Sequence, residues 1–158
     1  MQKSEFRYAF IGEIWAPKES IYASEPFLAL RHASGVFAHR TITGYRESYD
    51  ATKQLREFCR WCAAKMLPHW PQAPALFLEW CATGDANLDQ DLWVATRVTP
   101  PADGPCLVVQ SALWVHSSNY ACALLDNVKD CSDWTVDVLH DVEPVRDEFN
   151  RLIANGFE

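Results

Sequence analysis

The sequence predicts an α+β fold: a single domain over residues 1–158 with a mainly antiparallel sheet of five or six strands, two longer helices and one or two short ones packed on it. Three observations lead to this prediction. Residues 75–116 contain three runs rich in β-branched and aromatic side chains, each closed by turn-forming residues, which is typical of consecutive strands. Residues 51–67 carry an apolar stripe at helical spacing. The length, with 49% hydrophobic and 22% charged residues, suits one globular domain.

The N-terminal part predicts two strands around a short helix. Residues 5–15 alternate apolar and polar side chains, the pattern of a half-buried strand. Pro26 suits the first turn of a helix and Gly35 suits its end, so a short helix is expected between them. Residues 36–45 return to alternation and predict a second strand.

The clearest helix is expected over residues 51–67, with Asp50 as its N-cap. Its charged side chains lie off the apolar stripe, so one face of the helix should be buried. The expected buried side chains are Ala51, Leu55, Phe58, Cys59, Cys62 and Met66.

Three central strands are expected at residues 75–82, 91–99 and 106–116. Pro100 to Pro105 resembles a tight connection, so the second and third of these strands should form an antiparallel hairpin. This stretch is expected to organise the rest of the sheet.

Two helices and a sixth strand are expected in the C-terminal part. The first helix should begin at Ser118 and run to about Lys129. Residues 134–139 alternate and predict the sixth strand. Asp141 is the expected cap of a last helix that ends at Gly156, with acidic residues in its N-terminal half as the helix dipole prefers.

The net charge of −7 is distributed unevenly along the chain. Residues 1–67 carry ten basic and seven acidic residues, residues 68–125 carry one and five, and residues 126–158 carry three and nine. An acidic surface repels nucleic acid and the inner membrane leaflet, and it attracts basic proteins. We therefore expect no membrane partner, and no direct nucleic-acid binding except through the basic N-terminal helix.

The cysteines and the N-terminus both predict a cytoplasmic protein. The first residues contain no apolar stretch of the kind found in secretory signals. Most of the six cysteines lie within apolar patterns, where a reduced thiol behaves as a small hydrophobic side chain. They are therefore expected to be core thiols.

Two short motifs resemble metal or redox sites. Oxygen-bearing side chains alternate as at the front of a calcium loop, although Gln90 stands where that loop needs glycine, so an acidic turn is favoured and cation binding is left open. These side chains are Asp85, Asn87, Asp89 and Asp91. Cys59 and Cys62 have redox spacing but lie in mid-helix on the apolar stripe, which favours core packing. No metal site is expected, and without a glycine-rich phosphate loop no cofactor is expected.

The histidines are scattered, and the sequence alone assigns no catalytic residue. His116 precedes Ser117 and Ser118 and could belong to a hydrolase site, but no acidic partner can be assigned to it. An enzyme stays the alternative hypothesis: a small hydrolase or transferase with a His/carboxylate site in a sheet cleft. It requires His116 or His140 within hydrogen-bond reach of a carboxylate or thiol.

The preferred hypothesis combines the acidic C-terminal part with the seven tryptophans. Most tryptophans should be buried, but an exposed one would anchor a protein partner. We expect a small cytoplasmic binding protein that inhibits or neutralises another macromolecule by occluding its basic surface, as an immunity protein or a phage counter-defence inhibitor would. The partner and the oligomeric state are left open. The expected binding residues are Asp126, Asp130, Asp133, Asp137, Asp141, Glu143, Asp147, Glu148 and Trp134.

Overall fold

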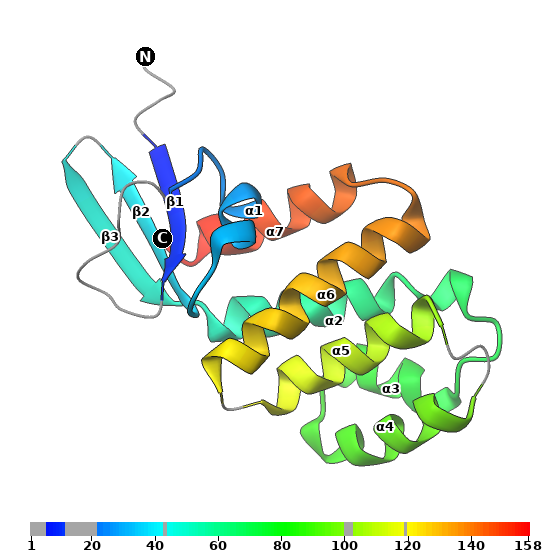
Figure 1. Ribbon diagram of the computed structural model, residues 1–158. Coiled ribbons are helices and arrows are strands. Elements are labelled where there is room, and N and C mark those ends of the chain that lie inside the picture. Colours follow the sequence, from blue (N-terminus) through cyan, green and yellow to red (C-terminus); the bar gives the residue numbers. More distant parts are fainter. Residues whose placement is uncertain (1–5, 12–21, 43, 100–102, 119) are drawn as a thin grey trace.

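The computed structural model describes residues 6–11, 22–42, 44–99, 103–118 and 120–158 (Figure 1). Within these residues a small antiparallel sheet stands beside a larger helical layer. The strands are β1 (Phe6–Ile11), β2 (Phe37–Ile42) and β3 (Tyr45–Asp50). The α-helices are α1 (Pro26–Ala29), α2 (Thr52–Ala64), α3 (Ala75–Thr83), α4 (Asp89–Val98), α5 (Pro105–Ser117), α6 (Ala121–Leu139) and α7 (Glu143–Asn155). Short 3₁₀ turns are η3 (Leu30–His32), η4 (Leu67–His69) and η5 (Ala86–Leu88).

The predicted sheet of five or six strands is wrong, because the sheet has three strands in the order β1-β2-β3. The strands expected over residues 5–15 and 36–45 are present as β1 and β2, with residues 12–15 outside the described part. β3 was not expected. Its hairpin with β2 turns at Gly44, whose φ of 79° is a conformation that glycine adopts without a steric penalty.

The three central strands expected at residues 75–82, 91–99 and 106–116 are instead the helices α3, α4 and α5. α5 packs against α2, α4 and α6, so it is apolar on almost every side. Such a helix has no polar stripe, and its apolar run cannot be distinguished from a buried strand by periodicity. The predicted hairpin is wrong for the same reason: Pro105 begins α5, and residues 100–102 lie outside the described part. The buried residues of α5 are Cys106, Val108, Val109, Ser111, Ala112, Leu113 and Val115.

The sixth strand, expected at residues 134–139, is the second half of α6. Its Thr135 Oγ1 donates a hydrogen bond of 2.6 Å to the Cys131 carbonyl oxygen, four residues earlier on the same helix. The helix expected to end near Lys129 therefore continues for ten more residues, because no glycine or proline interrupts it.

The two longer helices predicted from clear stripes are confirmed as α2 and α7. All six expected stripe residues of the 51–67 segment are fully buried. The Asp50 carboxylate accepts hydrogen bonds from the Thr52 backbone N–H (2.9 Å) and hydroxyl (2.6 Å) at the start of α2. Asp141 likewise accepts from the Glu143 N–H (3.1 Å) at the start of α7.

An aromatic cluster around Phe149 of α7 joins the sheet to the helices. Its ring lies 5.7 Å from Phe10 of β1, 6.1 Å from Phe27 of α1 and 4.9 Å from Phe58 of α2, measured between ring centroids. The Tyr49 hydroxyl of β3 donates a 2.7 Å hydrogen bond to the Ile153 carbonyl and adds a second link. None of the helices in the described part of the chain combines the length and apolar character needed to cross a membrane.

Candidate functional site

Four aspartates form a line along the outer face of α6. Asp126, Asp130, Asp133 and Asp137 follow one another at spacings of four, three and four residues, which places them on one face of a helix. All four are exposed, while α6 buries Leu124, Leu125, Val128 and Cys131 on another face. We call these four residues the acidic ridge.

The structure does not gather the other predicted acids into the same line. Asp141 lies in the turn after α6 and Glu143 begins α7, so both follow the C-terminal end of the acidic ridge along the chain. Asp147 and Glu148 lie further along α7, and the side chain of Glu148 is paired with Arg151 and only 14% exposed. The predicted acidic surface therefore consists of the ridge and a shorter extension.

Trp134, predicted as a partner contact, is half-buried and packs against the core. Among the described tryptophans, Trp114 is the exposed one: it is 50% exposed on α5. Its ring meets Trp93 of α4 edge-on, with the centroids 5.3 Å apart. Trp134 thus lies on the helix of the acidic ridge, whereas the more exposed Trp114 lies on α5.

A groove of about 510 Å³ runs along one side of the acidic ridge, and we call it the α1–α6 groove. It is lined by Phe27, Leu30, Arg31, Lys129, Ser132, Asp133, Val136, Asp137 and Val142. The Lys129 ammonium donates to the Ala33 carbonyl at 3.1 Å, so it is already engaged. Burial raises the pKa of the Asp133 carboxyl, Asp130 and Asp137 raise it further, and Arg31 partly opposes them.

Sequence reasoning missed a second site, in which Asp89 connects two side chains. One carboxylate oxygen accepts a 2.8 Å hydrogen bond from the Trp80 indole N–H, and the other lies 2.8 Å from His116 Nδ1. The Trp80 and His116 rings meet edge-on at 5.8 Å. A carboxylate only accepts hydrogen bonds, so Nδ1 carries the hydrogen and Nε2 is left for another partner.

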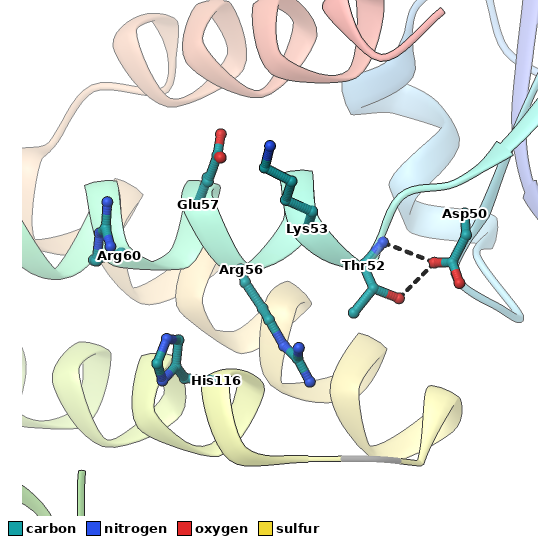
Figure 2. A pocket seen from close by; sticks show the side chains of 7 residues that line it. All are labelled: Asp50, Thr52, Lys53, Arg56, Glu57, Arg60 and His116. Atoms are coloured by element: carbon teal, nitrogen blue, oxygen red, sulfur yellow. Dashed lines mark hydrogen bonds between the residues drawn. The ribbon is translucent and has the colours of Figure 1, made fainter. Parts of the chain in front are cut away.

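His116 also faces a cavity of about 490 Å³ between α2 and α5, which we call the α2–α5 cavity (Figure 2). Its lining residues are Asp50, Thr52, Lys53, Arg56, Glu57, Arg60 and His116. The acidic partner that the sequence could not assign to His116 is therefore Asp89, 27 positions earlier. This His/carboxylate pair lies between two helices, α4 and α5, and not on the sheet.

The remaining candidate motifs have structural roles. Asp85 accepts a 2.9 Å hydrogen bond from the Asn87 N–H and begins η5, while both Asp89 oxygens have the partners given above. Cys59 and Cys62 are fully buried, as the core-packing interpretation predicted, and burial raises the pKa of both thiols. In the described part of the chain, no group of three or more His, Cys, Asp or Glu side chains is placed to hold a metal ion.

The assignment of function depends on this geometry. The chain matches no protein-family model, no curated protein and no solved structure.

Proposed function

We propose that this protein is a small binding protein that inhibits or neutralises another macromolecule by covering a basic surface on it. The observation that carries the proposal is the acidic ridge: four exposed carboxylates on one face of a single helix. Ridge carboxylates present a repeating negative charge to a partner, as a nucleic-acid backbone does. An array of this kind steers a basic protein and raises its association rate.

The surroundings of the ridge support a protein partner. The α1–α6 groove beside it has an apolar part formed by Phe27, Leu30, Val136 and Val142, and Val142 at its edge is 44% exposed. A basic side chain could lay its aliphatic stem along such a groove and place its charged end at Asp133 and Asp137. The ridge would repel a nucleic acid, and the unpaired thiols among the described cysteines suit the reducing cytoplasm.

Affinity purification with three forms of the protein tests the proposal. The ridge variant carries Asp126→Asn, Asp130→Asn, Asp133→Asn and Asp137→Asn. The control variant carries four changes at exposed acids elsewhere. These are Glu79→Gln, Asp85→Asn, Asp91→Asn and Asp103→Asn. The two variants have equal net charge, so they separate the position of the charge from its amount.

The wild type and the control should recover a stoichiometric basic partner from the native cell, and added salt should release it. The ridge variant should bind that partner at least about tenfold more weakly. The electrostatic mechanism is wrong if the ridge variant retains the partner, or if high salt releases none of it.

A second candidate function, an enzyme, is favoured by one observation. Asp89 fixes the His116 ring so that Nε2 is left for another partner, which is how a histidine general base is oriented. This candidate first requires a ligand in the α2–α5 cavity.

A further inference from the structure

The α2–α5 cavity differs from the acidic ridge in the sign of its charges. Its lining holds the cations Lys53, Arg56 and Arg60 against two carboxylates. One of these, Asp50, already accepts two hydrogen bonds from Thr52. The lining side chains therefore carry one more positive than negative charge, in contrast to the acidic ridge.

The ring of His116 is held from one side only. Asp89 binds Nδ1 and Trp80 packs edge-on against the ring, so its orientation is fixed. In the described part of the chain Nε2 has no hydrogen-bond partner. Figure 2 shows the ring rising from α5 toward the turn of α2 that carries Arg60. His116 can therefore accept a hydrogen bond from a ligand when neutral and donate one when protonated.

Arg60 is placed by packing rather than by an acid. Among the described residues its guanidinium has no hydrogen bond or ion pair, and it lies against Gly84 after α3. A Cβ atom at Gly84 would be 1.7 Å from Arg60 Nη1, so only glycine leaves room for the guanidinium in this position. Gly84 also has a φ of 63°, which independently favours glycine.

Arg56 connects the two walls of the cavity. Its Nε donates to the Val115 carbonyl (3.2 Å) and its Nη2 to the Ser118 carbonyl (2.9 Å), at the C-terminal end of α5. These bonds hold the turn that carries His116 against α2, and they leave Nη1 without a partner among the described residues. Figure 2 shows Lys53 and Glu57 projecting from the other side of α2.

We propose that the α2–α5 cavity binds the phosphoryl group of a small organic phosphate. Guanidinium groups match phosphate oxygens in geometry and charge, so Arg60 and the free Nη1 of Arg56 would hold the group. His116 Nε2 would share a proton with a third oxygen. At about 490 Å³ the cavity is in the range of small-molecule sites, which leaves room for the organic part. This site is independent of the acidic ridge.

Ligand titrations followed by the His116 imidazole NMR signals test the proposal. Phenyl phosphate is the probe, and phenylacetate and inorganic phosphate are the comparison arms. The His116 signals should shift saturably with millimolar phenyl phosphate, and phenylacetate should bind more weakly. Equal binding of phenylacetate would overturn the assignment to phosphates. Shifts with inorganic phosphate of the same affinity would show that no organic part is recognised, which would overturn the assignment to an organic phosphate.

Two variants and a control locate the binding. Arg60→Gln should weaken phenyl phosphate binding about tenfold, and Gly84→Ala should do so by displacing the guanidinium. Lys65→Gln removes an exposed cation at the C-terminal end of α2, outside the cavity, and should not change phenyl phosphate binding. The proposal fails if the wild type gives no saturable shift, or if a folded Arg60→Gln variant binds as tightly as the wild type. The ridge variant should bind phenyl phosphate normally, so failure here does not depend on the partner.

Discussion

Asp89 and the aspartates of the acidic ridge have the same side chain but differ in their burial and in their hydrogen-bond partners. Asp89 is 16% exposed at its side chain, and hydrogen-bond partners from two helices meet its two oxygens. The ridge aspartates are exposed, and at Asp133 the like charges of Asp130 and Asp137 are only partly opposed by Arg31. Asp89 fixes the orientation of the His116 ring. The ridge aspartates create a negative electrostatic potential but orient no neighbouring side chain among the described residues. The number of carboxylates therefore predicts little about their role until their hydrogen-bond and ion-pair partners are known.

The largest effect on stability should come from replacing Asp89. Asp89→Ala leaves the fully buried indole N–H of Trp80 and the Nδ1–H of His116 without an acceptor, which costs about 1–3 kcal/mol for each buried donor. Asp130→Ala on the ridge removes an exposed charge and should change the stability by less than about 0.5 kcal/mol. Urea denaturation of both variants measures the difference.

Asp89→Asn is the matched variant, since it keeps one acceptor oxygen and should fall between Asp89→Ala and the wild type. If Asp89→Ala and Asp130→Ala unfold at the same urea concentration, the two kinds of aspartate are not distinct in energy. The orientation of His116 by Asp89 would then be without support.

This contrast also explains how much could be predicted from the sequence. α2 and α7 were predictable because each has one apolar and one polar face, as residues such as Leu55 and Phe149 show. α5 was not, because helices surround it and its apolar residues no longer mark a face. β-branched residues such as Val108 and Val109 favour strands only when the surroundings of the segment are those of a sheet.

The two candidate sites also differ in how far the sequence could predict them. The spacing of the ridge aspartates is visible in the sequence, but residues 134–139 were expected to form a strand, which hid the single helical face. The bond between Asp89 and His116 links α4 to α5, and both were expected to be strands. No local pattern joins two residues that tertiary packing alone brings together, so this pair could not be found without the fold.

A smaller effect is expected at Cys81, whose thiol reports the charge of Arg60 beside the α2–α5 cavity. Burial raises the pKa of this thiol to about 11, and the nearby charge of Arg60 opposes the rise. Alkylation of Cys81 by iodoacetamide should therefore still accelerate about tenfold per pH unit between about pH 8 and 10, where an ordinary thiol levels off. Arg60→Gln should slow the reaction at each pH, and Lys65→Gln should not. Peptide mass spectrometry measures the rate, and a plateau near pH 9 would contradict the prediction.

The smallest effect should be a gain in stability from Asp133→Asn. Because burial and its like-charged neighbours raise the pKa of Asp133 above the ordinary 3.8, the folded protein binds this proton more tightly than the unfolded chain does. Stability is therefore lost as the pH rises through the folded-state pKa, and an uncharged Asn avoids that loss. The variant should gain less than about 0.5 kcal/mol at pH 7, since the site is largely exposed, and the gain should disappear below about pH 4.

Asp91→Asn is the control for Asp133→Asn, since the same stability measurement should show a loss and not a gain. Asp91 lies in the first turn of α4, where a negative charge stabilises the helix dipole, so its removal should lower the melting temperature slightly at pH 7. If Asp133→Asn also lowers it, the ridge carboxylates do not repel one another measurably. A gain at Asp133 together with a loss at Asp91 would mean that the ridge charges oppose folding. A basic partner that bound the folded protein at the ridge would then stabilise it by an amount that grows with the logarithm of its affinity.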